Sequence, residues 1–133
     1  MTNLCAFACR VSGAEWGETT VNALTAGGAK VEYWRSVTEA WPGIQYTAVR
    51  ARKLGPAQSS ERFLSNAAYR GMPDIRCGDE VTVNGHSGLI AGHNSSANFD
   101  VLFIDGPWNE KTINVHPSAD QLMSGSTLMN TSR

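Results

Sequence analysis

The side chains best suited to chemistry stand in the short segment Gly85-His86-Ser87-Gly88, where a histidine precedes a serine. Hydrolases with a nucleophilic serine combine these two side chains, because the imidazole removes the hydroxyl proton. The nucleophile elbow of many such enzymes has the pattern Gly-x-Ser-x-Gly between a strand and a helix. Here the second glycine comes one residue early, and the serine follows a turn. We therefore interpret the segment as a turn followed by a strand, and we predict that the protein is not an enzyme.

A metal site is the second chemistry that the residue types allow. Zinc sites usually contain closely spaced ligand pairs such as Cys-x-x-Cys or His-x-x-x-His. The candidate ligands of this chain form no such pair, and the glycines near them are not followed by a helix, as a phosphate-binding loop requires. We therefore predict neither a metal nor a cofactor. The candidate ligands are His86, His93, His116, Cys77 and Asp100.

The loop from His93 to Asn98 is a stronger candidate for function. It joins two predicted strands through six residues of mostly small polar type, although a simple connector could be shorter. Loops that a rigid scaffold positions often carry binding sites. The alternative is an Asx-type turn held by its own side chains. In the binding interpretation, the partner-contacting residues are Asn94, Ser95, Asn98 and Asp100.

Two tryptophans are candidates for contact with a partner. Trp108 follows Pro107 in a turn, where it either anchors an interface or folds back over the end of a barrel. Trp34 lies in a predicted helix but off its apolar stripe, which places it at the edge of a partner surface. Tyr33 and Trp41 belong to that stripe and are predicted to be buried.

One cluster of basic residues is predicted in the first half of the chain. Arg50 and Arg52 share a face of a predicted strand, and Lys53 follows them. Arg62 and Arg70 on the next helix are in a position to join this cluster. Such a cluster suits phosphate groups or an acidic protein surface. The alternative is a solvated sheet face near the end of a strand.

Composition and charge limit the classes of protein. The chain has 133 residues and a net charge of −1, and 41% of its residues are hydrophobic, which suits one domain or two very small ones. Up to Ile75 there are eight Lys and Arg against six Asp and Glu, and from Arg76 onward three against six. No apolar run approaches the roughly 18 residues of a membrane span. The first residues alternate like a strand, and the cysteines are odd in number, so we predict a cytoplasmic protein without membrane contact.

The elements that must position these residues follow from hydrophobic spacing and turn residues. Strands, helices and turns alternate in the first half, whereas residues 73–123 contain short strands joined by turns such as Asn84-Gly85. We therefore predict an α+β fold with an N-terminal ββαβα unit at 1–72, a small barrel at 73–123 and a flexible tail at 124–133. The first unit has predicted strands at 4–11, 18–24 and 44–52, and helices that begin after Thr25 and Ser59-Ser60 and end at Pro42-Gly43 and Gly71.

The second half resembles an SH3-like, or KOW-like, β-barrel over about forty residues. The resemblance rests on the Gly78-x-x-Val81 opening, the Gly88-Leu89-Ile90 strand and the Val101-x-Phe103-x-Asp105-Gly106 pattern. This barrel serves many unrelated functions. The whole arrangement is similar to small proteins of bacteriophages and prophages, which pair a short ββαβ unit bearing an aromatic-rich helix with a compact barrel. The similarity implies a mobile-element protein in the cytoplasm of a bacterial host.

These observations favour non-enzymatic binding. Our first hypothesis is a phage-type protein that binds and modulates a host protein, for example by inhibiting a defence complex. An acidic barrel with exposed aromatic residues suits a basic partner that handles nucleic acid. The alternative is direct nucleic-acid binding, with Arg50, Arg52, Lys53 and Arg62 on phosphate groups and barrel aromatics against bases.

Overall fold

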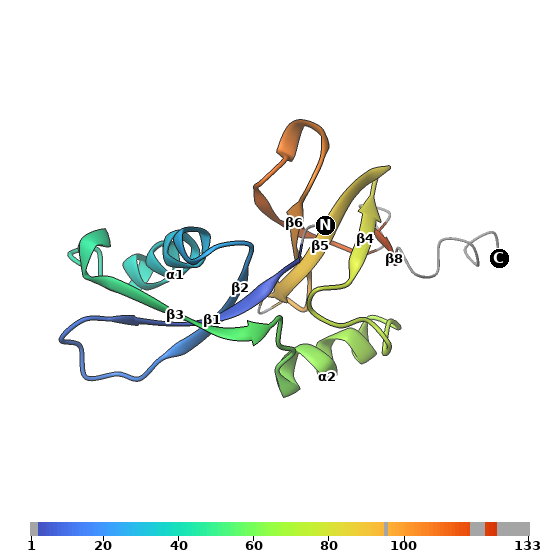
Figure 1. Ribbon diagram of the computed structural model, residues 1–133. Coiled ribbons are helices and arrows are strands. Elements are labelled where there is room, and N and C mark those ends of the chain that lie inside the picture. Colours follow the sequence, from blue (N-terminus) through green and yellow to red (C-terminus); the bar gives the residue numbers. More distant parts are fainter. Residues whose placement is uncertain (1–2, 95, 118–121, 125–133) are drawn as a thin grey trace. The chain divides into compact units, whose positions relative to one another are not determined.

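The computed structural model describes residues 3–94, 96–117 and 122–124. The chain divides into two compact units, Met1–Gln58 and Ser59–Arg133 (Figure 1). Over the described residues the fold is mixed α+β, with two α-helices, one three-stranded sheet and one five-stranded sheet, both antiparallel. The predicted α+β class is therefore confirmed.

The first unit is an antiparallel sheet with one helix packed on it. Its strand order is β2-β1-β3, so β1 is hydrogen-bonded on both sides. The elements in chain order are β1 (Cys5–Val11), β2 (Thr19–Ala23), α1 (Ala26–Ala40), the 3-10 turn η1 (Tyr46–Ala48) and β3 (Val49–Pro56).

Helix α1 begins where the sequence predicts and ends slightly before the predicted Pro42-Gly43 stop. The Thr25 hydroxyl oxygen accepts a hydrogen bond from the Gly28 amide at 3.0 Å, which satisfies one of the free amides of the first turn. The helix ends at Ala40, just before Pro42, which cannot continue it. The third strand differs from the prediction, because η1 occupies 46–48 and the strand begins at Val49.

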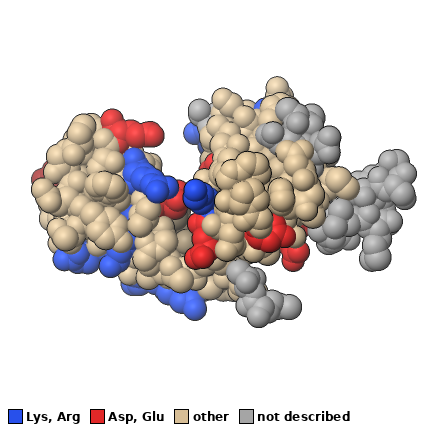
Figure 2. All heavy atoms as spheres, turned by 90° about the horizontal axis from the view of Figure 1, so that it is seen from above, with Lys and Arg blue, Asp and Glu red and all other residues tan. Residues whose placement is uncertain are grey.

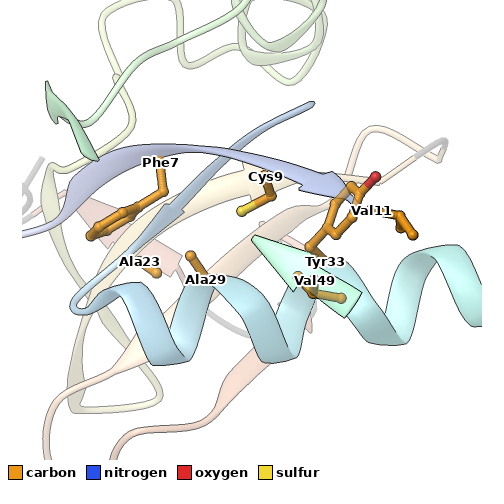
Figure 3. Packing of buried hydrophobic residues seen from close by; sticks show 7 residues of the cluster. All are labelled: Phe7, Cys9, Val11, Ala23, Ala29, Tyr33 and Val49. Carbon is orange, nitrogen blue, oxygen red and sulfur yellow. The ribbon is translucent and has the colours of Figure 1, made fainter. Parts of the chain in front are cut away.

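The core of the first unit lies between β1 and α1. Side chains from the sheet and the helix pack against one another there, as Figure 3 shows. On β1, alternate residues face the helix because successive side chains of a strand point to opposite sides. The buried cluster consists of Phe7, Cys9, Val11, Ala23, Ala29, Tyr33 and Val49.

The second unit is a five-stranded antiparallel sheet preceded by a helix. Its strand order is β7-β6-β5-β4-β8, so four consecutive strands form a meander and the last strand returns to pair with the first. The elements are α2 (Glu61–Tyr69), β4 (Glu80–Val83), β5 (His86–His93), β6 (Phe99–Phe103), the 3-10 turn η2 (Gly106–Trp108), β7 (Thr112–Val115) and β8 (Leu122–Ser124).

Helix α2 groups with this second unit, whereas the predicted boundary lies after Met72. Its Phe63 ring, 1% exposed, lies 5.8 Å from the Phe99 ring of β6 and 6.0 Å from the His93 ring of β5. The apolar face of the helix is therefore buried against the following strands. Of the two predicted caps, Ser59 and Ser60, the helix uses Ser60, whose hydroxyl oxygen accepts from the Phe63 amide at 3.0 Å.

Local turn chemistry shapes the sheet of the second unit. Asn84 and Gly85 have φ angles of 50° and 86°, which a two-residue type I′ hairpin requires, and they join β4 to β5 as predicted. Gly88 is needed for space, because an added Cβ would clash with the Val101 side chain on the neighbouring strand.

Strand β8 was not predicted from the sequence. Its Leu122 pairs with Val83 of β4.

Two further predictions concern the ends of the chain and its relation to membranes. The predicted flexible tail 124–133 is corrected at its first residue, because Ser124 pairs with Val81 in β8, and residues 125–133 lie outside the described residues. Within the described ranges, neither helix has the length and apolar character needed to cross a bilayer.

Candidate binding surfaces

The loop that joins β5 to β6 is built around Asn94. Its side-chain oxygen accepts hydrogen bonds from the Ser96 amide at 2.9 Å and the Asn98 amide at 3.1 Å. Ala97, with φ of 63°, takes the left-handed conformation that closes the turn. The loop is therefore an Asx-type turn held by its own side chain, which was the alternative to a binding loop. Ser95, another of the predicted contact residues, lies outside the described residues.

Arg70, at the end of α2, holds the same loop from outside. Its guanidinium donates to the Ala97 carbonyl at 3.1 Å, the Ser96 carbonyl at 3.0 Å and the Asn98 side-chain oxygen at 2.9 Å. The planar fork of arginine suits several oxygens at once. Arg70 therefore belongs to the hydrogen-bonded loop of the second unit.

Asp100 and Asn94 meet through a third side chain on β7. The Asn114 side-chain amide donates to an Asp100 carboxylate oxygen at 3.0 Å, and the Asn114 side-chain oxygen accepts from the Asn94 side-chain Nδ2 at 3.0 Å. Three of the four predicted contact residues of this region, Asn94, Asn98 and Asp100, thus have hydrogen bonds inside the unit. Their role toward a partner stays a prediction.

Trp108 lies in the turn between β6 and β7 and is 40% exposed. Its ring packs at 5.5 Å from the Phe103 ring and edge-on at 5.9 Å from the His86 ring. His86 Nδ1 lies 3.8 Å from an Asp105 carboxylate oxygen. Trp108 thus has features of both predicted states: its ring folds back over Phe103, and part of its indole stays exposed to solvent. We call His86, Asp105, Trp108 and the neighbouring Glu110 the Trp108 end.

A second aromatic surface lies in the first unit and was missed. The Trp16 ring, from the β1–β2 turn, stacks on the Trp41 ring with centroids 4.9 Å apart and planes 18° apart. Trp41 is 54% exposed, so the prediction that it is buried was wrong. The helix ends at Ala40, so Trp41 no longer follows the helical spacing that would direct it into the core. Tyr33 is buried as predicted, and its hydroxyl accepts from Trp16 Nε1 at 3.1 Å.

Trp34 lies in the same region but contributes to the packing of the first unit. Its indole Nε1 donates to the Ile44 carbonyl at 3.0 Å, and its ring meets the Tyr46 ring edge-on at 5.9 Å. The side chain is half-buried against the core cluster. Its predicted place at the edge of a partner surface remains untested.

The predicted basic cluster is divided by the sheet. Arg50 and Arg52 share the face of β3 that points away from α1, since their partners across the ladder are Arg10 and Ala8 of β1. Lys53 pairs with Phe7, a residue of the core face, so it projects from the opposite side of β3. Arg62 belongs to the second unit.

Sequence reasoning missed Arg10, because the neighbour of a residue on another strand depends on the register. On the face of the molecule that Figure 2 shows, Lys and Arg atoms form small separate groups, and some of these groups lie beside Asp and Glu atoms. The strand register between β1 and β3 is what places Arg10, Arg50 and Arg52 on one face of the sheet.

The chemistry suggested by the histidines does not assemble around Ser87. Successive residues of β5 point to opposite faces, which directs the Ser87 hydroxyl away from the His86 ring. The Ser87 backbone amide donates to an Asp105 carboxylate oxygen at 2.9 Å, which makes Asp105 a partner of the turn. Among the described residues, His, Cys, Asp and Glu side chains form no group of three that could hold a metal ion.

Two titratable side chains have environments that shift their pKa. Burial lowers the pKa of His93, with a smaller contribution from Arg62, and the Asp100 carboxylate opposes this shift. Burial raises the pKa of the Cys9 thiol, as does the Glu18 carboxylate, while Lys30 opposes them. Both shifts favour the neutral side chain.

Comparison of the chain with protein-family models, curated proteins and solved structures finds no match.

Proposed function

We propose that this chain is a non-enzymatic binding protein that presents the Trp108 end of its second unit to a basic surface on a protein partner. The observation that carries the proposal is the state of Trp108, which is 40% exposed although its ring is held against Phe103 and His86. Exposed tryptophans are favoured anchors of protein interfaces, because a large apolar ring is buried on binding.

The turn that carries Trp108 is closed by backbone hydrogen bonds. The Glu110 amide donates to the Phe103 carbonyl at 2.8 Å, and the Lys111 amide donates to the Trp108 carbonyl at 2.9 Å. A binding residue in a turn that is already ordered loses little conformational freedom when a partner docks. This favours an anchor role over that of a mobile cover.

The excess of acidic residues in the second unit favours a partner with a basic surface. Residues 59–133 contain eight Asp and Glu against five Lys and Arg, and Asp105 and Glu110 stand on either side of Trp108 in the turn. A negative surface steers a positive one and disfavours nucleic acid, which is itself anionic. The proposed target is a protein that handles nucleic acid, in the setting of a phage-type modulator of a host protein that the sequence resemblance implies.

We also propose that the second unit is an SH3-like barrel. The support is its strand order, in which the first strand of a four-stranded meander also pairs with the last strand, β8. That pairing brings the end of the unit back to its beginning, as closure of a small barrel requires.

The test is capture of partners from nuclease-treated bacterial lysate with three proteins, the unchanged chain, Trp108→Ala and Trp41→Ala. We expect a basic protein that is captured by the unchanged chain and by Trp41→Ala and is lost with Trp108→Ala. Trp41→Ala is the matched control, because it removes an equally large exposed ring from the other unit.

A further variant tests whether the carboxylates beside Trp108 contribute to binding. Glu110→Gln keeps the size of the side chain and removes one carboxylate, so it should weaken capture and reduce its dependence on salt. Capture that is the same for all variants, or an acidic captured protein, would contradict the proposed function.

A further inference from the structure

We propose that the first unit binds the phosphate groups of a nucleic-acid backbone on the face of its sheet opposite α1. The residues are Arg10, Arg50 and Arg52, which we call the arginine face. This site is separate from the Trp108 end and does not depend on the proposed function. It differs from the basic cluster predicted from the sequence, because it includes Arg10 and excludes Lys53 and Arg62.

The strand register assembles the arginine face. Arg10 of β1 stands directly opposite Arg50 of β3, and Arg52 stands opposite Ala8, two residues further along. Residues two apart on a strand project from the same side, about 6.7 Å from each other. Arg10, Arg50 and Arg52 are all exposed, so three guanidinium groups share one side of two neighbouring strands.

The pair Arg10 and Arg50 has an electrostatic cost. Like charges placed directly opposite each other on antiparallel strands destabilise the pairing. Within the described residues Arg10 has no carboxylate within ion-pair distance, whereas Arg52 Nη2 is bound to a Glu18 oxygen at 2.8 Å. An anion between Arg10 and Arg50 would remove the repulsion.

The side chain of Arg50 is already oriented for such an anion. Its Nη1 donates to the Thr47 carbonyl at 2.7 Å and to the Val49 carbonyl at 3.2 Å. These bonds fix the guanidinium, and within the part of the chain that the structure describes its Nη2 and Nε donate to no acceptor. A donor fixed before binding loses less conformational entropy when the ligand arrives.

The other residues of this face indicate what is recognised. The neighbours on β2 are polar, Thr20 and Asn22, and the large exposed aromatics of the unit are not among the residues paired with β1. A surface with guanidinium groups and without a stacking platform reads phosphate and not base identity. We therefore expect binding that is independent of sequence and strongly dependent on salt.

The experiment measures binding of the full chain to a fluorescein-labelled 20-nucleotide DNA, as a single strand and as a duplex, between 50 and 200 mM salt. Because Arg52 is already paired with Glu18, the phosphate contacts of Arg10 and Arg50 predict a slope of log K against log salt of about −1.8 for the duplex and about −1.4 for the single strand. Arg10→Gln and Arg50→Gln should each reduce the slope by about 1. Lys53→Gln is the matched control, because it removes a charge from the same strand but the opposite face.

The outcomes separate this site from the alternatives. Absence of binding at 50 mM salt would overturn the proposal, and so would an equal loss with Lys53→Gln. Arg10→Lys keeps the charge and should retain most of the slope, which shows that a loss with Arg10→Gln is electrostatic. Polyglutamate bound as tightly as DNA would assign the face to an acidic protein instead. Trp108→Ala should leave DNA binding unchanged, because Trp108 does not belong to the arginine face. The proposed function rests on Trp108 alone, so absence of DNA binding would not contradict it.

Discussion

The Trp16 ring stacks on the Trp41 ring at a centroid distance of 4.9 Å and so joins the β1–β2 turn to the end of α1. The buried Tyr33 hydroxyl accepts from the same Trp16 indole, which ties the stack to the core of the unit. Offset aromatic pairs contribute about 0.5–1.5 kcal/mol beyond the area that they bury. We expect a double-mutant cycle of Trp16→Ala and Trp41→Ala to give a coupling free energy in this range when unfolding is measured in denaturant.

The single variants should differ in a defined order. Trp16→Ala should lower the free energy of unfolding more than Trp41→Ala, because it also leaves the Tyr33 hydroxyl without its donor. Leu54→Ala, which removes another exposed apolar side chain of the same unit, is the control. A coupling energy indistinguishable from zero would show that the two rings do not stack in solution.

Arg70 should determine the order of the loop between β5 and β6. Its guanidinium donates to the carbonyls of Ala97 and Ser96 and to the side chain of Asn98. A hydrogen bond of a charged group contributes about 1.5–3 kcal/mol to the free energy of unfolding. We expect Arg70→Gln to lower the free energy of unfolding by about 2 kcal/mol. Amide hydrogen exchange at Ala97 and Asn98 should become faster.

The control for this prediction is Arg62→Gln, a change of the same type on the same helix. It should leave exchange in the loop unchanged. Arg70→Lys should behave like Arg70→Gln, since an ammonium group cannot reach the same three oxygens in one geometry. Full protection of the loop in Arg70→Gln would mean that the Asn94 turn alone is sufficient to hold it.

The parts of the fold that depend only on residues close together in the sequence could be predicted from it. The caps at Thr25 and Ser60 and the hairpin at Asn84-Gly85 require only a side chain, or a backbone conformation, within three residues. The pairing of Leu122 with Val83 could not be predicted, because it joins residues far apart in the chain and its short segment has no alternation of its own.

The candidate sites show the same distinction. Trp108 was selected from the sequence because an exposed ring in a turn has a local signature. Arg10 and Arg50 lie forty residues apart in the sequence, and only the register of β1 against β3 places them together. Trp41 was assigned to the core because helical spacing was extended one residue beyond Ala40, where α1 ends.

The three cysteines should react with thiol reagents in a fixed order. Cys9 is fully buried, and burial together with Glu18 raises the pKa of its thiol, so little thiolate forms near neutral pH. Cys77 is also buried, whereas Cys5 is half-buried. We expect one cysteine to react first with iodoacetamide at pH 8 in the folded protein, and mass spectrometry should identify it as Cys5.

The variant Cys5→Ser provides the control. It should remove the early reaction and leave the two slow sites, which should react only when denaturant unfolds the chain. Early modification of Cys9 would show that the β1–α1 core opens under native conditions.

The stability of the second unit should depend on the protonation of His93. Burial lowers its pKa below the usual value of 6.5, which the unfolded chain retains. Above pH 6.5 the side chain is neutral in both states, so its protonation does not affect unfolding. As the pH falls through 6.5, the unfolded chain takes up the proton more readily than the fold does, so the free energy of unfolding decreases. The decrease stops only when the pH is also below the pKa of the folded state.

Two variants isolate this effect when the free energy of unfolding is measured at pH 7.5 and pH 5.5. His93→Gln removes the titrating group, so the loss of stability between these two pH values should be smaller than in the unchanged protein. Asp100→Asn removes the carboxylate that opposes the shift, so the pKa of His93 should fall further and the loss should become larger. Equal losses in all three proteins would mean that His93 has the same proton affinity in the folded and unfolded states. The burial of its ring beside Phe63 would then have no electrostatic consequence.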